Sequence, residues 1–129
     1  MEILYQTESS LAPAEFIDIL NRSTLGERRP ITDLSSIQKM CEHANLTITA
    51  RLEGQLIGIA RSLTDFAFCT YLSDLAVDKQ YQHIGIGKQL IERTKANTPE
   101  ALLILLAAPA AIDYYPKVGM KCFEHCYIF

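Results

Sequence analysis

The chain has 129 residues, of which 49% are hydrophobic, and its formal net charge is −3 at pH 7. This length fits one domain, residues 1–129, with one real hydrophobic core. The acidic balance and the scattered basic residues exclude a broad basic surface for nucleic acid. The longest apolar run, residues 101–108, is too short to cross a bilayer. We therefore expect neither a nucleic-acid nor a membrane partner.

The four cysteines do not follow a metal-binding pattern. Cys122 and Cys126 flank His125, but a structural zinc site needs a second pair of ligands, and the sequence shows none. We expect no metal, and two cysteines on one face of a terminal strand. The N-terminal residues lack the basic and apolar regions of a signal peptide, so we expect a reduced, cytoplasmic protein.

The first 45 residues predict a short strand at residues 3–5 and two helices. Pro13 favours the start of the first helix, and Thr32 is a candidate N-cap for the second. Residues 23–30 between them are polar and typical of a loop. Apolar residues recur at helical spacing, so both helices should pack on the core. They are Phe16, Ile17 and Leu20 in the first helix and Leu34, Ile37, Met40, Cys41 and Ala44 in the second.

The middle of the chain changes to the period of a strand. Residues 46–52 alternate between apolar and polar, Glu53-Gly54 is a turn signal, and residues 56–63 form the expected hairpin partner. Residues 69–77 are a third long strand candidate. These segments predict an antiparallel meander.

The last third alternates between helix and strand. Residues 85–95 have helical spacing, with Ile86, Leu90 and Ile91 facing inward. The apolar run 102–106 predicts a central strand buried on both faces. A short helix over 109–117, ending near Gly119, and a last strand over 122–129 should follow. The order predicts an α/β fold with an α+β mixed sheet.

The segment from Asp74 to Lys88 is the most informative part of the sequence. A strand ends there and a helix begins around two glycines. The N–H groups at a helix start are unpaired and glycines allow close approach, so residues 82–88 predict an anion site for a nucleotide pyrophosphate. The spacing Q-x-x-G-x-G is neither a Rossmann nor a P-loop motif. A tight turn with packing glycines, or a nucleotide site for ATP or NAD, are the alternatives.

The same residues carry a resemblance to a known family. Gln82, Gly85 and Gly87, after a strand reading D-L-A-V-D, resemble the acetyl-CoA site of the Gcn5-related N-acetyltransferase (GNAT) superfamily. The stretch Y-Y-P-K-V-G-M at residues 114–120 resembles the family's aromatic-Tyr-x-K-x-G-F element. The resemblance implies a GNAT-like fold, a central mixed sheet of six or seven strands flanked by about four helices. It also implies acetyl transfer from acetyl-CoA to a primary amine, by direct attack in a ternary complex.

The resemblance further implies roles for individual residues. Tyr115 would be the general acid for the CoA thiolate, whereas Tyr114 is interpreted as a core residue. Backbone groups of the strand would bond the pantetheine arm and polarise the acetyl carbonyl. The implied cofactor-binding residues are Leu75, Ala76, Val77, Gln82, His83, Ile84, Gly85, Ile86, Gly87, Lys88, Ala108, Ile112 and Tyr115.

The acceptor side departs from the family pattern. The position where some relatives place a catalytic glutamate lies near Tyr71, which is not a carboxylate, so Asp74 is the nearest candidate for a base or a substrate ligand. Arg28 and Arg29 could hold a carboxylate or phosphate of the acceptor, a small-molecule amine or a protein amine. The alternative for the two arginines is that they are solvated loop charges, and Asp74 could equally be a surface charge or bond to a loop backbone. The alternative for the whole chain is an acyl-CoA-binding sensor or regulatory module without catalysis. A short tail would leave the sheet edge open, and a homodimer could cover it.

Overall fold

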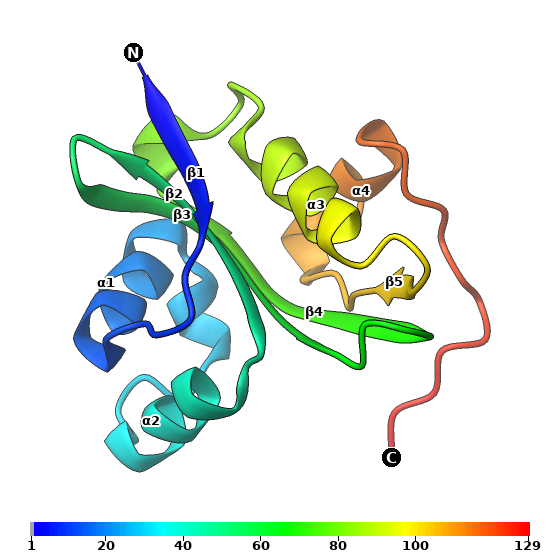
Figure 1. Ribbon diagram of the computed structural model, residues 1–129, viewed down its shortest axis with the longest axis horizontal. Helices are drawn as coiled ribbons and strands as arrows, with labels where there is room; N and C mark the ends of the chain where they lie inside the picture. Colours follow the sequence, from blue (N-terminus) through cyan, green and yellow to red (C-terminus); the bar gives the residue numbers. More distant parts are fainter. Residues whose placement is uncertain (1) are drawn as a thin grey trace.

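The computed structural model describes residues 2–129, in which one sheet lies between two pairs of helices (Figure 1). The strands are β1 (Ile3–Thr7), β2 (Leu46–Leu52), β3 (Gln55–Thr64), β4 (Cys69–Val77) and β5 (Leu102–Ile104). The helices are α1 (Pro13–Ser23), α2 (Leu34–His43), α3 (Ile86–Asn97) and α4 (Tyr114–Lys117). Short 3₁₀ turns are η1 (Leu25–Arg28), η2 (Lys79–Tyr81) and η3 (Pro109–Ala111).

The sheet follows the order of the chain, β1-β2-β3-β4-β5. β1 to β4 are antiparallel neighbours, and β5 pairs in parallel with β4 after the crossover helix α3. Glu53 and Gly54 both have positive φ, 51° and 84°, in the tight turn between β2 and β3. The predicted meander and the mixed sheet are therefore confirmed.

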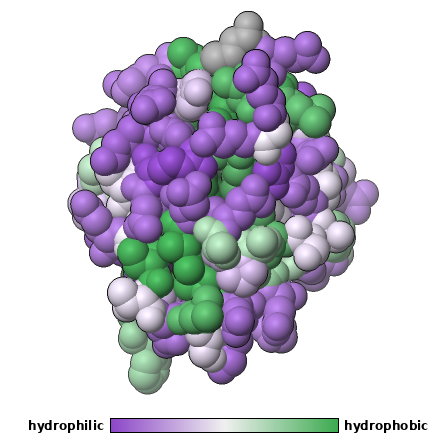
Figure 2. All heavy atoms as spheres, turned by 90° about the vertical axis from the view of Figure 1, so that its left-hand side faces the viewer, coloured by the Kyte–Doolittle hydropathy of each residue, from purple (hydrophilic) through white to green (hydrophobic). Residues whose placement is uncertain are grey.

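Two apolar cores hold the layers together. α1 and α2 cover one face of the sheet, and α3 and α4 cover the other (Figure 1). Phe16, Leu20 and Ile37 are fully buried under the first pair, as the helical spacing predicts. On the inward face of α3, Ile86 and Leu90 are also buried. The side of the molecule with α1 is mostly hydrophilic, with an apolar patch in the lower half of the view and further apolar atoms near the top (Figure 2).

β5 differs from the predicted central strand. It has three residues at the edge of the sheet, and Leu102 and Ile104 are 66% and 49% exposed. Leu103 and Leu105 point to the other face and pack against the core below α3. The prediction of burial on both faces is wrong because α1 and α2 do not extend over β5 and no further strand of residues 2–129 pairs with its outer edge.

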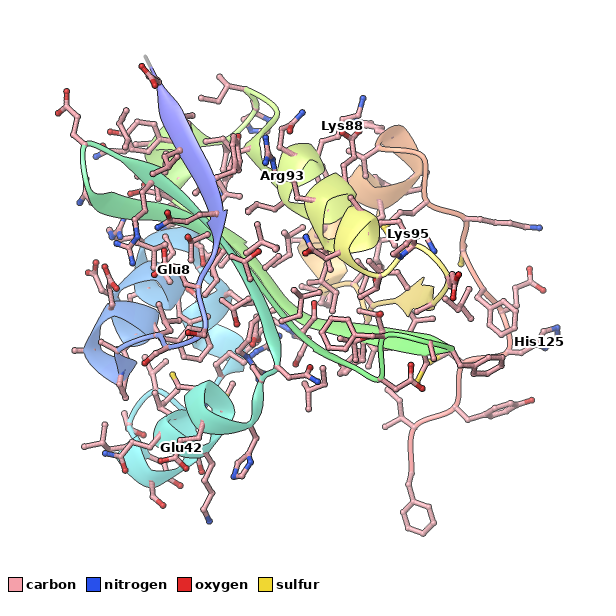
Figure 3. All side chains as sticks on the ribbon, in the orientation of Figure 1. Glu8, Glu42, Lys88, Arg93, Lys95 and His125 are labelled. Atoms are coloured by element: carbon pink, nitrogen blue, oxygen red, sulfur yellow. The ribbon has the colours of Figure 1, made fainter. Side chains whose placement is uncertain are left out.

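The predicted last strand is also wrong. Residues 122–129 have no regular secondary structure and are exposed, and His125 points away from the body of the molecule (Figure 3). A strand exists only through hydrogen bonds to a neighbour, and this segment pairs with no strand within residues 2–129. The sheet described here therefore has five strands, and the six or seven that the resemblance implies are not present.

Three local predictions need smaller corrections. The N-cap of α2 is Asp33, whose carboxylate accepts the Ser36 N–H at 3.2 Å, and not Thr32. Leu34 is 54% exposed, so it is not part of the packed face of α2. The helix predicted over 109–117 is split into η3 and α4, and Gly119 follows it with φ 96°, as expected of a C-cap glycine.

An ion-pair network joins β1, β2 and α1. Arg51 donates to Glu8 at 2.8 Å and 3.0 Å and to Glu15 at 2.6 Å and 2.9 Å, and Glu8 also accepts from the Thr49 hydroxyl. Glu8 lies at the junction between β1 and α1 (Figure 3). The hydrogen bonds from Arg51 lower the pKa of Glu8 to about 2. The network fixes the first strand and helix to the sheet.

Replacing Glu8 by glutamine should reduce stability at pH 7 by about 1–3 kcal/mol, because charge-assisted hydrogen bonds are lost. The folded pKa of Glu8 is below its ordinary value of 4.5, so its contribution is present above that value and is lost as pH falls toward about 2. In urea unfolding, the difference in the free energy of unfolding between wild type and Glu8→Gln should therefore be clear at pH 7 and much smaller at pH 3. Glu42→Gln, at an exposed position, is the control and should change little. An equal difference in unfolding free energy at both pH values would contradict the stabilising role of the ionised Glu8 carboxylate.

Candidate active site

The start of α3 has backbone features that an anion site requires, and the anion site itself stays a prediction. The first helical hydrogen bond runs from the Gln89 N–H to the Gly85 carbonyl at 3.1 Å, so the preceding N–H groups lack acceptors within the helix. Gly85 is the N-cap, with φ 91°, and His83 also has a positive φ of 68°. His83, Ile84 and Lys88 are exposed around this turn, and Lys88 stands at the start of α3 (Figure 3). The turn presents unpaired donors toward solvent.

The two glycines of the motif have different environments. A Cβ at Gly85 would meet no atom within 4 Å, so the space in front of this residue is open to a ligand. A Cβ at Gly87 would lie 2.4 Å from the Tyr114 hydroxyl. Gly87 therefore allows α4 to pack against the first turn of α3. Tyr114 is 36% exposed, so its interpretation as a core residue is wrong.

β4 carries an irregularity beside this site. Arg61 pairs with Asp74 and Ser62 pairs with Leu72, so Ser73 is an extra residue, a β-bulge. The parallel pairing with β5 ends at Tyr71 and Ile104. Residues 72–77, including Leu75, Ala76 and Val77, therefore have no strand partner on the β5 side within the described chain. This open edge leads directly to the start of α3 and could accept an extended amide-containing ligand as an added strand.

Tyr115 lies on α4 and packs against the core that α3 covers. Burial raises the pKa of its phenol and the neighbouring Tyr114 raises it further, whereas the positive charge of Arg29 lowers it. The rings of Tyr114 and Tyr115 meet edge to face, with centroids 5.3 Å apart. Tyr115 is therefore a protonated phenol at neutral pH, within the electrostatic reach of a residue from the opposite helical layer.

Asp74 is not a free carboxylate. Its side chain has no exposed surface, and its two oxygens accept from Nε of Arg29 and Nε of Arg61. Through Arg29, Asp74 contacts the loop that follows η1. A base role is not favoured, because both oxygens are already engaged with guanidinium groups.

The other predicted residues lie in different places. Arg28 is exposed, Ala108 is the N-cap of η3, and Ile112 is 60% exposed between η3 and α4. Gln82 is exposed, but its side-chain amide donates to the Val77 carbonyl at 3.0 Å. The structure thus brings Gln82 and Val77 into direct contact. Within residues 2–129 the exposed side chain of Arg28 takes no part in the ion pair between Arg29 and Asp74.

Sequence reasoning missed two arginines that support the site. Arg61 interrupts the apolar strand β3, and a charge in such a run signals a buried partner. Arg22 of α1 donates to Asp78 and to the Leu56 carbonyl, and the Asp78 carboxylate accepts the Gln80 N–H at 2.9 Å. Arg22 therefore holds the end of β4, where the turn that leads to α3 begins.

A shallow hollow of about 480 Å³ lies where β4 and β5 still pair, on the face of α2. Tyr71 and Ile104 line it together with Leu63 and His43. No group of three or more potential metal ligands was found within residues 2–129. None of the helices in that range is long and apolar enough to cross a membrane.

The structure is thus an α/β domain whose mixed sheet has an open strand edge next to the amino end of its crossover helix. Comparison with known families agrees with this class. The model of the acetyltransferase (GNAT) domain matches residues 22–127. The chain therefore belongs to the GNAT acetyltransferase superfamily.

Relatives and solved structures support the assignment. The chain is 35% identical over 72 residues to the chloroplastic GCN5-related N-acetyltransferase 2 of Arabidopsis thaliana, covering 54% of this chain and 28% of the relative. It is 36% identical over 70 residues to a histone acetyltransferase of Glycine max, covering 52% and 30%. The chain thus spans less than a third of the length of these curated relatives.

The fold is similar to that of solved acetyltransferase structures. A GNAT-family acetyltransferase from Streptococcus pneumoniae superposes with a TM-score of 0.80 at 18% identity, covering 99% of this chain and 98% of the other. An aminoglycoside acetyltransferase from an uncultured soil metagenomic sample superposes with a TM-score of 0.72 at 23% identity, covering 98% and 93%. At these identities the likeness concerns the fold alone.

Proposed function

We propose that this protein is an acetyl-CoA-dependent N-acetyltransferase that acetylates a primary amine by direct attack in a ternary complex. The observation that carries the proposal is the open edge of β4, which leads into the unpaired N–H groups at the start of α3. The open space at Gly85 also fits a pyrophosphate. Acetyl-CoA, when bound, supplies an activated acetyl thioester.

The residues of the chain would bind and orient acetyl-CoA and protonate the departing thiolate. Backbone groups of Leu75, Ala76 and Val77 would hold the pantetheine arm, and an N–H among them would polarise the acetyl carbonyl. The backbone of residues 82–88 and the charge of Lys88 hold the phosphates. Tyr115 carries a proton at Oη for the departing thiolate. Ala108 and Ile112 contribute apolar surface beside the arm.

The proton of the amine needs another route than Asp74. Both of its oxygens are bonded to arginines, and Tyr71 stands where relatives place a carboxylate. We assign the removal of this proton to water. The acceptor is a small-molecule or protein amine that enters from the face of α1 and α2. We also predict a homodimer that covers the open β5 edge. A cytoplasmic location is likewise a prediction.

The engaged state of Asp74 also favours a second candidate, an acyl-CoA-binding sensor without catalysis. Such a module would use the same anion site and the same β4 edge, but it would not need a base. It predicts binding of acetyl-CoA without thiol release in the presence of any amine. Thiol release with at least one amine would exclude it.

Thermal unfolding in the presence of acetyl-CoA, CoA, ATP and NAD tests the proposed cofactor. Acetyl-CoA at a hundredfold excess over its Kd should stabilise the fold by about 2.7 kcal/mol and raise Tm by several degrees. ATP and NAD should have smaller effects. Lys88→Gln should reduce the shift by removing a charge at the anion site, whereas Lys39→Gln on the distant α2 should not.

No shift with acetyl-CoA or CoA would contradict the proposed function. An equal shift with ATP or NAD would instead favour a different nucleotide at the glycine turn.

A further inference from the structure

A cluster of Arg29, Arg61 and Asp74 has an excess of positive charge. The Asp74 carboxylate is completely buried between the two guanidinium groups, and the side chains of Arg61 and Arg29 are 7% and 21% exposed. One carboxylate balances only one of the two arginines. Burial of an unbalanced charge is costly, so such a surplus calls for an anion.

Arg61 is satisfied inside the protein. Besides Asp74, it donates to the Met40 carbonyl at 3.1 Å and to the Ser73 hydroxyl at 3.1 Å. Its guanidinium also lies 5.8 Å from the centre of the Phe16 ring, within the range of a cation–π contact. Arg61 is therefore the internal partner of Asp74 in the cluster.

Arg29 presents the remaining charge. Besides Asp74, it donates to the Arg28 carbonyl at 2.8 Å and to the Ser73 carbonyl at 2.9 Å. A guanidinium has five N–H donors, and these bonds use three of them, so two are left. Because the side chain is partly exposed, these donors can meet a ligand.

The position of Arg29 connects it to the reaction. Ser73, which it contacts, is the bulged residue of β4, two positions after the last pairing with β5. The positive charge of Arg29 also lowers the pKa of the Tyr115 phenol. Arg29 therefore lies on the face of α1 and α2, next to the opened edge on which the acetyl group would lie.

We propose that Arg29, held in place by Asp74, binds an acidic oxygen group of the acceptor, which is thus an amine that carries a carboxylate or a phosphate. The inference rests on the proposed acetyl transfer and names the class of its acceptor. Asp74 is a positioning residue in this arrangement. It fixes the Nε edge of Arg29, so that the free donors keep one orientation, as planar recognition of an oxyanion requires.

Paired amines test the proposal. Phenylalanine and 2-phenylethylamine differ by a carboxylate, and phosphoethanolamine and ethanolamine differ by a phosphate. The wild type should prefer at least one acidic member by tenfold or more in kcat/KM, mainly through a lower KM. Arg29→Gln should abolish the preference, Arg29→Lys should keep part of it, and Lys39→Gln should keep it fully. A pair-specific preference would also tell carboxylate from phosphate.

Two results would overturn the inference. The first is a wild type that acetylates the neutral member of each pair as well as the acidic one. The second is a fall in kcat for all amines alike in Arg29→Gln. This result would mean that the Arg29 charge acts on the chemical step and not on recognition of the acceptor.

A binding measurement separates this inference from the failure of catalysis. N-Acetylphenylalanine and N-acetyl-2-phenylethylamine, and the N-acetyl derivatives of phosphoethanolamine and ethanolamine, are added to the protein with CoA, and Tm is measured. In at least one pair the acidic compound should raise Tm of the wild type more than its neutral partner, and this difference should vanish in Arg29→Gln. If the difference is present but no amine is acetylated, the recognition site stands and acetyl transfer fails. If it is absent from both pairs in the wild type, the recognition site fails.

Discussion

Replacement of Tyr115 by phenylalanine should lower kcat by about 10²–10⁴-fold, the contribution of one positioned general acid. The ring keeps its packing against the core below α3, so the affinity for acetyl-CoA should change little. Thiol release measures kcat, and the acetyl-CoA-dependent shift in Tm measures binding. A large loss of rate with an unchanged shift is the expected pair of results.

The pH dependence of kcat in the wild type and in Tyr115→Phe is a sharper test of the same role. Burial, followed by Tyr114, raises the pKa of the Tyr115 phenol, whereas Arg29 lowers it. The proton-donating form is therefore present below this raised pKa and is lost as pH rises through it. The wild-type kcat should decline only in strongly alkaline solution, and the residual rate of Tyr115→Phe should lack that decline.

Tyr127→Phe is the matched control, because Tyr127 is 90% exposed in the tail, and it should behave as wild type. Unchanged kcat in Tyr115→Phe would show that the phenol does not donate the proton. In that case water or another group protonates the thiolate, and Tyr115 serves only packing.

Replacement of Asp74 by asparagine should destabilise the fold by about 3–5 kcal/mol, the range for removal of one partner from a buried ion pair. The carboxylate is completely buried and is the only carboxylate paired with Arg29 and Arg61 within residues 2–129. Without it, two guanidinium groups face each other in the interior. Urea unfolding at pH 7 measures the loss.

An exposed aspartate of the same chain provides the comparison. Asp18 pairs with Arg22 at 2.9 Å, and its side chain is 59% exposed. Asp18→Asn should cost less than about 1 kcal/mol, because solvent already screens the pair. Similar losses in the two variants would mean that Asp74 is not the centre of the cluster, and its positioning role toward Arg29 would then lose its basis.

Local signals in the sequence were sufficient for several elements. Gly119 was predicted as the glycine that ends the last helix, and it has the positive φ of such a cap. Gly85 was predicted at the start of α3 as a point of close approach, and the structure adds that its φ is positive. The apolar spacing in α1 and α3 predicted the buried faces, because the helical period alone decides which residues share a face. The two motifs also led to the correct family.

Other features depended on contacts between distant segments. The tail has the composition of a strand, but a strand needs a partner, and residues 122–129 have none in the described structure. β5 is apolar, yet its position at the edge leaves Leu102 and Ile104 exposed. Neither outcome can be read from the segment itself, since both depend on which strands lie next to it.

Asp74 shows the difference most clearly. The sequence alone determined that a carboxylate, that of Asp74, lies in β4 shortly before the turn that leads to α3. Strict alternation would place Asp74 on the same face as Leu72, but the bulge at Ser73 sends the two side chains to opposite faces. Only the tertiary structure decided that this carboxylate meets Arg29 from one loop and Arg61 from another strand. The reason is physical: a one-residue shift in register reverses every following side chain, and it is set by pairing across the sheet.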